Sequence, residues 1–314
     1  IVGENPMLTE PNLGHTSEAM EKLAFLVVQD IFMHETAVKA DVVLPATSFA
    51  EKEGTFTNSE RRVQRVRKVI DPVGESRPDW EIVQDLAHRI ANRLGIELSG
   101  FNHPDPNSIF VEISAVTPIL GGISHERLDK EGGIQWPCPT LDHPGTPRMY
   151  GDAFPRGKGR FIAVEQKAPS AEEPDDHYPF ILNTGRVLYH WHGGTVTRRV
   201  DGLVESFPQL RVAVHPSDVS RLELVNGDPV RIISRRGKLE GVVFETEDVA
   251  PSSVFVPFAK LKESAANWLT NNVYDQSSRI PEFKVCAVSL ERIDNPKEWQ
   301  QSKDKRNWKK RHYW

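Results

Sequence analysis

Apolar residues recur every three or four positions in "DWEIVQDLAHRIANRLG", residues 79–95. The side chains at positions 80, 83, 86, 87, 90 and 94 would form one apolar stripe on an α-helix. Asp79 is a residue type that caps helix N-termini, and Gly95 can adopt the left-handed conformation that ends a helix. The pattern therefore predicts a helix between these two residues. We expect His88, on that helix, to be a surface or packing histidine rather than a ligand.

Short apolar runs alternate with an amphipathic segment over the first 47 residues. "FLVVQD" and "DVVLPAT" are typical of buried strands, with the short helix "ETAVKA" between them. The preceding "TSEAMEKLAF" predicts a helix that Thr16 or Ser17 caps. Strand, helix and strand at this spacing indicate a parallel sheet, whose ligands bind at the carboxyl ends of the strands. Gln29 and Asp30 lie at such an end.

The pattern changes again after residue 177. Five short apolar runs, separated by turn signals such as "NGD" and "RRG", predict a β-barrel. They are "YPFILNT", "RVAVHP", "PVRIISRRG", "KLEGVVFET" and "SSVFVPFA", with a short helix over 218–224. Before them comes a stretch rich in Pro and Gly, which closes with the acidic, Pro-bounded "PSAEEPDDH".

The predicted fold class is therefore α/β followed by β. The expected parts are the C-terminal part of an α/β domain over 1–99, a connector over 100–177, a β-barrel domain over 178–292 and a basic tail over 293–314.

Composition narrows the function classes. The chain has 314 residues and a formal charge of −5, which argues against general nucleic-acid binding. The last 14 residues nevertheless carry six Lys or Arg and one Asp. They are either a solvated extension or a segment that docks on an acidic partner or RNA. No run approaches the ~18 apolar residues of a membrane span, so we expect no direct membrane insertion.

Cysteine usage and the first residues add two further expectations. Cys138 and Cys286 are far apart in sequence, so they form no CxxC motif and we expect both to be free thiols. The chain starts at Ile1, and "IVGENP" is typical of a strand and loop cut at its left side. We expect a missing N-terminal portion, so export is undecided.

The stretch "TGRVLYHWHGGTVTRR", residues 184–199, carries the densest chemistry in the chain. Its two histidines could hold a metal, its glycines and arginines could cradle phosphates, or it could be a solvated loop. It follows a predicted strand, and Arg186, Arg198 and Arg199 offer planar donor forks that suit phosphates. Glycines let backbone amides approach a ligand closely. An anionic ligand explains all of these features, whereas zinc explains only the histidines, so the sequence predicts no metal ligand here.

The ordered set of motifs resembles the molybdopterin oxidoreductases. "TGR", "HWH" and "TRR" are similar to the opening of that family's C-terminal domain, a double-psi β-barrel that binds molybdopterin guanine dinucleotides. "HPSDVSRLELVNGDPVRIISRRG" and "VPFAKLKESAANWLTNNVYDQSSRIPEFKVCAV" are similar to later parts of that barrel. Upstream, "GENP", "QD", "EKEG" and "RPDW" match contacts from the family's Rossmann-like α/β domain. The resemblance covers residues 1–292.

This resemblance implies a set of cofactor-binding positions. They are Asn5, Gln29, Asp30, Lys52, Asp79, Thr184, Gly185, Arg186, Val187, Leu188, His190, Trp191, His192, Gly193, Thr195, Asn267 and Lys284. Phe258 is a candidate for lining the substrate cavity, and a barrel-core aromatic is the equal alternative. Carboxylates accept hydrogen bonds from amino groups of guanine or pterin, and lysines donate to ring atoms or phosphates.

Within the family, "EKEGTFTNSERRVQ", "GGIQWPCP" and "PEFKVCAV" are most similar to formate dehydrogenase catalytic subunits. The resemblance implies a bis-molybdopterin guanine dinucleotide cofactor with molybdenum or tungsten, oxidation of formate to carbon dioxide, and two electrons passed to iron–sulfur clusters. The metal-ligating Cys or selenocysteine and the iron–sulfur ligands are then expected in the missing N-terminal portion, so no catalytic residue lies in this chain.

The resemblance further implies iron–sulfur or flavin electron-transfer partner subunits and a cytoplasmic enzyme, with the periplasm left open. Nitrate reductases of the family share the HWH stretch and remain an alternative. A scaffold subunit without catalysis, as in respiratory complex I, is an alternative of another class.

Overall fold

The computed structural model describes residues 1–165, 170–261 and 264–294 of the chain. Two compact units divide it. The first unit holds residues 1–3, 27–32 and 41–165, and the second holds residues 4–26, 33–40 and the chain from 166 onward. The predicted basic tail falls mostly on residues 295–314, outside the described residues.

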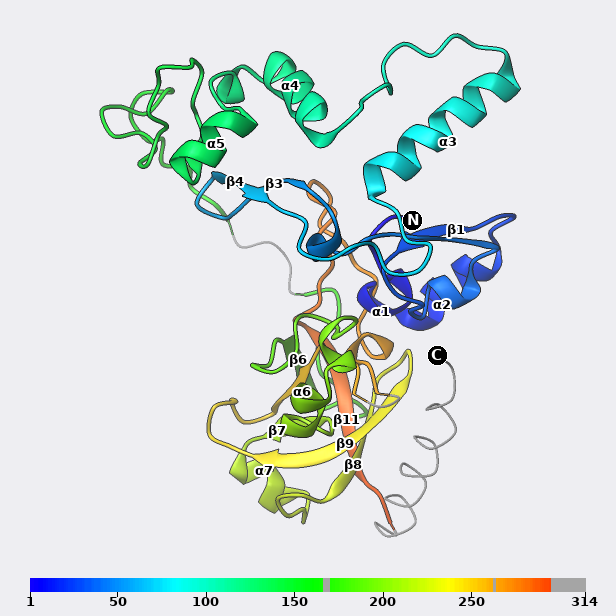
Figure 1. Cartoon of the computed structure of the whole chain (residues 1–314). Helices are drawn as coiled ribbons and strands as arrows, with labels where there is room; N and C mark the ends of the chain where they lie inside the picture. Colours follow the sequence, from blue (N-terminus) through cyan, green and yellow to red (C-terminus); the bar gives the residue numbers. More distant parts are fainter. Residues whose placement is uncertain (166–169, 262–263, 295–314) are drawn as a thin grey trace. The chain divides into compact units, whose positions relative to one another are not determined.

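Parallel strands open the first unit. β1 (Val27–Asp30) and β2 (Val42–Pro45) pair in parallel, with Val28 opposite Val43. Val2 forms a further parallel bridge to Gln29, which agrees with a strand-like start of the chain. The mixed α/β character that the sequence predicts is therefore present (Figure 1). The backbone after β2 stays tied to the start of the next helix, because Thr47 N donates to the carbonyl of Arg77 at 3.1 Å.

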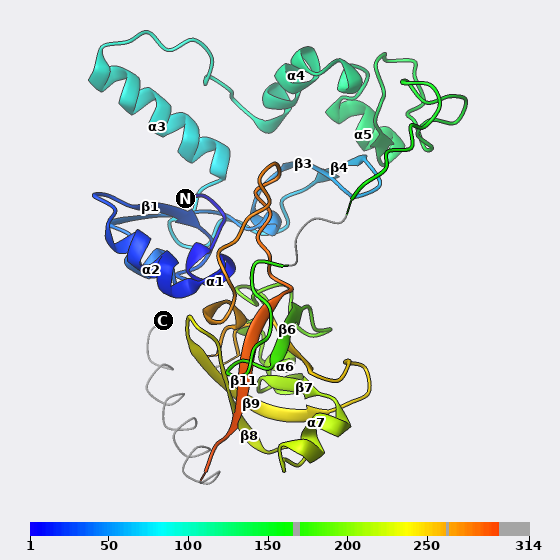
Figure 2. The same ribbon diagram turned by 180° about the vertical axis from the view of Figure 1, so that it is seen from behind.

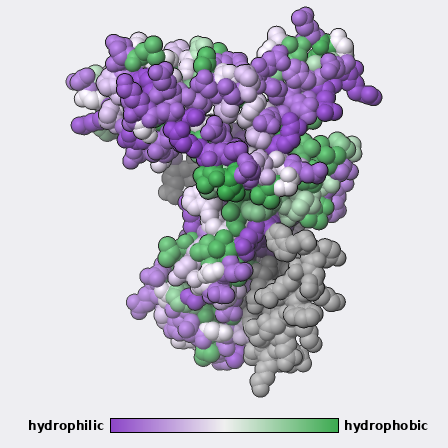
Figure 3. All heavy atoms as spheres, in the orientation of Figure 1, coloured by the Kyte–Doolittle hydropathy of each residue, from purple (hydrophilic) through white to green (hydrophobic). Residues whose placement is uncertain are grey.

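Helices and an antiparallel sheet complete this unit. Its sheet has the order β3–β4–β5, from strands β3 (Gly54–Thr57), β4 (Arg62–Val66) and β5 (Ile134–Gln135). Its helices are η2 (Phe49–Glu51), α3 (Asp79–Leu94), α4 (Pro106–Val116), η3 (Pro118–Leu120) and α5 (His125–Glu131). Val63, Phe110, Leu128 and Ile134 are the centre of its buried core. The stretch predicted as a connector is thus helical over much of 106–131. On the face drawn in Figure 3, hydrophilic side chains predominate over α3, α4 and α5.

Six strands close a barrel in the second unit, in the order β10–β6–β11–β8–β9–β7. They are β6 (Phe180–Gly185), β7 (Arg211–Val214), β8 (Pro229–Ile233), β9 (Lys238–Glu245), β10 (Ser253–Pro257) and β11 (Cys286–Arg292). Five of the six correspond to the predicted runs, and the barrel prediction is confirmed. β6 pairs in parallel with β10 and antiparallel with β11, which lies beside it in both views (Figures 1 and 2).

Apolar positions of these strands fill the barrel. Leu182, Val212, Val230, Ile232 and Val254 are fully buried, as expected when alternate residues of a closed sheet point inward. The unit also contains α1 (Pro6–Thr9), α2 (Leu13–Glu21), η1 (Ala37–Lys39), η4 (Thr197–Arg199), α6 (Asp201–Ser206), α7 (Pro216–Arg221) and η5 (Ala266–Trp268). Helices α1, α2 and η1 come from the first 40 residues, although the sequence places that segment in an α/β domain.

Two helix starts differ from their predictions. α2 begins at Leu13, because the Asn12 side chain accepts a hydrogen bond from His15 N at 3.3 Å, so Thr16 and Ser17 are not its caps. α3 does end at Gly95, with φ of 66°. Its first residue is Asp79, however, and Asp79 makes no capping bond. The Asp79 carboxylate is engaged elsewhere, as the site shows.

Candidate functional site

The stretch 184–199 begins where β6 ends at Gly185, and two later segments hold its start. Phe258 N, just after β10, donates to the carbonyl of Gly185 at 2.8 Å. Thr184 Oγ1 donates to the carbonyl of Phe283 at 2.7 Å, and Lys284 Nζ donates to the carbonyl of Thr184 at 2.7 Å. Two of the predicted cofactor residues, 100 positions apart, are therefore in direct contact. The closed barrel brings them together because β6 and β11 are neighbours.

The histidines of this stretch take different places. His190 is 2% exposed, and its Nδ1 lies 3.2 Å from Thr197 Oγ1, which also accepts from Trp191 N at 3.1 Å. Burial lowers the pKa of His190, and a backbone contact at Phe207 opposes this only in part. His190 is thus a neutral, inward-facing residue that shapes the loop. His192 is exposed and has a left-handed backbone with φ of 50°.

The three arginines also differ. Arg186 is exposed, 3.0 Å from His192 Nε2, and its guanidinium lies 5.8 Å from the centre of the Trp191 ring. Arg198 binds both oxygens of Glu35 at 2.7 Å. Arg199 donates from Nε to the carbonyl of Thr195 at 3.1 Å. Arg198 is thus occupied by a carboxylate, whereas the exposed Arg186 contacts a histidine and an aromatic ring.

Neighbouring predicted residues border this surface. Leu188 and Trp191 are 90% and 69% exposed. Val187 pairs with His190 across a tight turn. The Phe258 ring packs edge-on against Phe283, with ring centres 5.7 Å apart. The Phe258 ring is half-buried beside the start of the stretch, and its two alternative roles stay predictions.

Packing explains two of the glycines. A Cβ on Gly185 would lie 2.7 Å from a ring carbon of Phe255, and one on Gly193 would lie 2.9 Å from the Leu8 side chain. Gly194 instead has φ of 81°, which favours glycine for conformational reasons. The absence of side chains at 185 and 193 therefore serves close internal packing, in addition to any approach by a ligand.

Asn5 and Asn267 use their side chains internally. Asn5 Nδ2 donates to Glu35 at 2.8 Å and to Thr195 Oγ1 at 3.2 Å, while its oxygen accepts from the amide and hydroxyl of Thr36. Asn267 Nδ2 donates to the carbonyls of Leu8 and Thr9 at 3.2 and 3.0 Å. Both residues are buried. Their amides fasten the N-terminal segment of this unit, so their predicted cofactor contacts stay predictions.

Three predicted residues of the first unit meet around one carboxylate. Gln29 Nε2 donates to Asp79 Oδ1 at 2.9 Å, and Lys52 forms an ion pair with Asp79 Oδ2. Gln29 is the second-last residue of β1, Lys52 follows η2 and Asp79 opens α3, so the fold itself brings the three together. Asp30 Oδ1 accepts from the amides of Ile31 and Phe32 at 2.7 and 3.2 Å. The cluster supplies both donors and acceptors, as recognition of a heterocycle requires.

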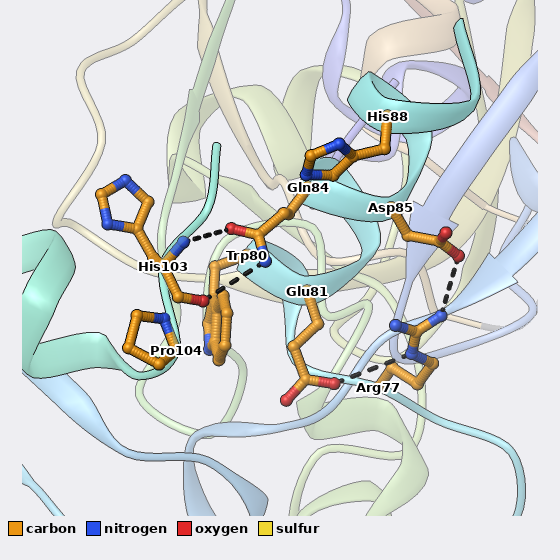
Figure 4. Close-up of a pocket in the computed structure, with 8 residues that line it drawn as sticks. All are labelled: Arg77, Trp80, Glu81, Gln84, Asp85, His88, His103 and Pro104. Carbon is orange, nitrogen blue, oxygen red and sulfur yellow. Dashed lines mark hydrogen bonds and ion pairs between the residues drawn. The ribbon is translucent and has the colours of Figure 1, made fainter. Parts of the chain in front are cut away.

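A cavity of about 520 Å³ lies beside α3 and is lined by residues of the same unit (Figure 4). Arg77 pairs with Asp85 at 3.2 Å, and Gln84 exchanges two hydrogen bonds with the backbone of His103. His88 Nε2 lies 2.8 Å from the carbonyl of Phe101, which agrees with its prediction as a packing residue. The polar groups that line the cavity therefore pair with one another or with nearby backbone.

Two features are absent from residues 1–165, 170–261 and 264–294, the part of the chain that the structure describes. Within those ranges no three His, Cys, Asp or Glu side chains are grouped to hold a metal. Within the same ranges no helix is long and apolar enough to cross a bilayer. Cys138 and Cys286 are free and buried, as expected, and burial raises the pKa of the Cys286 thiol to about 11.

Glu35 is a central residue that sequence reasoning missed. Its carboxylate binds Arg198, Lys260 and Asn5, which are 163, 225 and 30 positions away. Burial alone raises the pKa of Glu35, but the two cations outweigh burial and hold it well below its usual range. No local signal in "HETAVKA" indicates these partners, because they meet only in the folded chain.

Comparisons with known proteins find a match for the first part of the chain and another for the barrel. Residues 1–89 match the Molybdopterin oxidoreductase family model, and residues 180–287 match the Molydopterin dinucleotide binding domain. The F420-dependent formate dehydrogenase subunit alpha of Methanocaldococcus jannaschii is 46% identical over 295 residues, which cover 93% of this chain and 43% of that protein. Formate dehydrogenase 2 subunit alpha of Methanococcus maripaludis, also F420-dependent, is 44% identical over 93% of this chain and 42% of its own length. The chain thus spans less than half the length of these relatives.

The fold has a counterpart among solved structures. Acetylene hydratase from Pelobacter acetylenicus superposes with a TM-score of 0.66 at 15% identity, over 92% of this chain and 43% of that one. At this identity the likeness concerns the fold alone. The two family matches therefore place residues 1–89 with the molybdopterin oxidoreductases and residues 180–287 with the molybdopterin dinucleotide-binding domains.

Proposed function

We propose that this chain is the cofactor-binding, C-terminal part of the catalytic subunit of a molybdenum- or tungsten-dependent formate dehydrogenase. The observation that carries the proposal is the contact between Lys284 and Thr184, because it brings a lysine from the last part of the barrel domain beside the start of the stretch 184–199. The relatives that are 44–46% identical are named formate dehydrogenase alpha subunits. Neither nitrate reduction nor a scaffold role has a comparable observation in its favour.

The residues present fit a pterin dinucleotide. Its pyrophosphate requires positively charged hydrogen-bond donors. The exposed side chains of Arg186 and Lys284 supply such donors at the barrel. Its pterin and guanine rings carry amino groups and ring nitrogens, which match the mixed donors and acceptors of Gln29, Lys52 and Asp79. We assign both groups of residues, the one at the barrel and the one around Asp79, to the same type of cofactor.

When bound, the pterin-held metal would supply two-electron redox chemistry toward formate. The residues of this chain bind and orient the cofactor. Arg186 and Lys284 neutralise phosphate charge, His190 stays neutral and keeps the loop in shape, and Phe258 packs against Phe283 beside the start of the loop. The metal-ligating Cys or selenocysteine and the iron–sulfur ligands belong to the rest of the catalytic subunit.

The finer architecture and the partners are part of the same proposal. We assign the parallel β1–β2 pair to a Rossmann-like domain and the closed barrel to the double-psi type. Electrons leave through iron–sulfur or flavin subunits in the cytoplasm, and coenzyme F420 is the first acceptor to test because the relatives carry it in their names.

Metal and pterin analysis of the complete purified protein tests the proposal. We expect molybdenum or tungsten together with pterin, and formate-dependent reduction of an artificial acceptor. Protein with neither metal nor pterin would contradict cofactor binding and favour a scaffold. Reduction of nitrate without oxidation of formate would replace the substrate while leaving the cofactor assignment in place.

A further inference from the structure

Glu35 joins three segments of the second unit through one carboxylate. Arg198 Nη2 lies 2.7 Å from both of its oxygens, Lys260 Nζ lies 2.8 Å from Oε1, and Asn5 Nδ2 lies 2.8 Å from Oε2. The side chains of Glu35, Arg198 and Lys260 are only 24%, 19% and 18% exposed. Ion pairs that are this sheltered are sensitive to the loss of one partner.

Each partner of Glu35 also borders the far end of the stretch 184–199. Arg198 belongs to it, in η4. Lys260 donates its backbone amide to the carbonyl of Gly193 at 2.9 Å. Asn5 donates to Thr195 Oγ1 at 3.2 Å. The start of the stretch is held by Lys284 and Phe258, and its end is held by the cluster around Glu35.

This arrangement divides the cations into two groups. Arg198 and Lys260 face a carboxylate that stays ionised, because together they hold the pKa of Glu35 below its usual range despite burial. Arg186 faces His192 and the Trp191 ring, and Lys284 faces a carbonyl. The first pair is therefore occupied internally, while the second pair keeps its charge available to an anionic ligand.

We propose that Glu35 is a positioning residue, which fixes Arg198 and Lys260 so that the loop over 190–199 is preformed and Arg186 and Lys284 take the phosphates of the cofactor. This inference rests on the proposed function. Arg198 then stabilises the loop and does not bind phosphate, which differs from the sequence-based prediction that all three arginines suit phosphates.

Glu35→Gln in the complete enzyme tests this, with Glu172→Gln as the matched control. Glu172 is also sheltered and also binds two cations of the second unit, Arg235 at 2.5 Å and Arg236 at 2.7 Å. Both variants should lower the melting temperature. Only Glu35→Gln should release metal and pterin faster, by about tenfold, the effect of losing one charge-assisted hydrogen bond from the framework.

The outcomes separate the two proposals. A wild-type enzyme without metal or pterin contradicts the proposed function. A loaded wild type, with Glu35→Gln releasing cofactor at the wild-type rate or no faster than Glu172→Gln, overturns the positioning role alone. If Glu35→Gln does not fold, Lys260→Met decides, since it removes one cation and keeps the Glu35–Arg198 pair. Faster cofactor release from this variant supports the role, and an unchanged rate overturns it.

Discussion

Lys284 Nζ donates a hydrogen bond to the backbone carbonyl of Thr184 across 100 residues of sequence. The contact places a lysine charge beside the first residue of the predicted dinucleotide-binding stretch, next to Gly185. It also ties the segment before β11 to the end of β6. Lys284 thus has a part in the framework and, in the proposed function, a part in cofactor binding, and the two can be separated by experiment.

Lys284→Ala should reduce cofactor content strongly while lowering the free energy of unfolding by only about 1 kcal/mol, the net worth of one hydrogen bond. Metal and pterin analysis measures the first effect, and urea unfolding measures the second. Lys238→Ala, at an exposed position of β9, is the control and should leave cofactor content unchanged. Wild-type content and full turnover in Lys284→Ala would refute the assigned contact.

Gly185→Ala should destabilise the protein by about 1–3 kcal/mol, because the new Cβ would lie 2.7 Å from the Phe255 ring. Gly202→Ala is the matched control. Its Cβ meets nothing within 4 Å and it lies in α6, so this variant should be neutral or about 0.5 kcal/mol more stable. Chemical denaturation of both variants measures the difference. Equal stabilities would show that the ring moves aside without cost.

His190 should make the protein less stable as the pH falls below about 6.5. Burial lowers the pKa of His190 in the folded chain, so the unfolded chain binds more protons in this range. The stability that the neutral ring contributes is complete above the unfolded pKa, ~6.5, and is lost as the pH falls through the folded one. His190→Gln should therefore show a shallower loss of stability between pH 7.5 and 5, values chosen to bracket ~6.5. Parallel curves for variant and wild type would argue against a buried neutral ring.

Asp79 and Lys52 should be energetically coupled. A double-mutant cycle with Asp79→Asn and Lys52→Met is expected to give a coupling of about 0.5–1 kcal/mol, reduced by solvent because Asp79 is 38% exposed. Lys68 and Asp71 form a solvent-exposed ion pair at 2.9 Å and serve as the control cycle. We expect no measurable coupling energy between them. If the coupling energy between Asp79 and Lys52 equals that of the control pair, the Asp79 ion pair is no more than a surface contact.

The sequence predicts those elements whose pattern is local. The helix over 79–94 follows from its period and its final glycine, and five barrel strands follow from apolar runs between turns. The strand 286–292 was not singled out, since "CAVSLER" is interrupted by Ser289 and ends in two charged residues. The start of α2 at Asn12 was missed because Thr16 and Ser17 offered equally good caps.

Contacts between residues that are far apart in the chain could not be predicted from local sequence patterns. The motif order predicted that Lys284 and Thr184 serve one ligand, and the barrel brings them into contact. Glu35 has no motif, and its partners lie far away in the chain, so its role emerges only from the fold. Asn5 and Asn267 show a second reason. Each belongs to a recognisable motif, but a motif does not predict whether a side-chain amide contacts a ligand or other parts of the same chain.

The second unit is discontinuous, since it takes residues 4–26 and 33–40 as well as the chain from 166 onward. Excising the barrel at residue 166 would keep all six strands, yet it would strip Leu8 from Gly193 and Glu35 from Arg198 and Lys260. Two cations would then face solvent with no counter-charge from residues 4–40. Chimaeras that exchange this domain between relatives must therefore carry the first 40 residues along with it, or the stretch 184–199 will lose the contacts that support it.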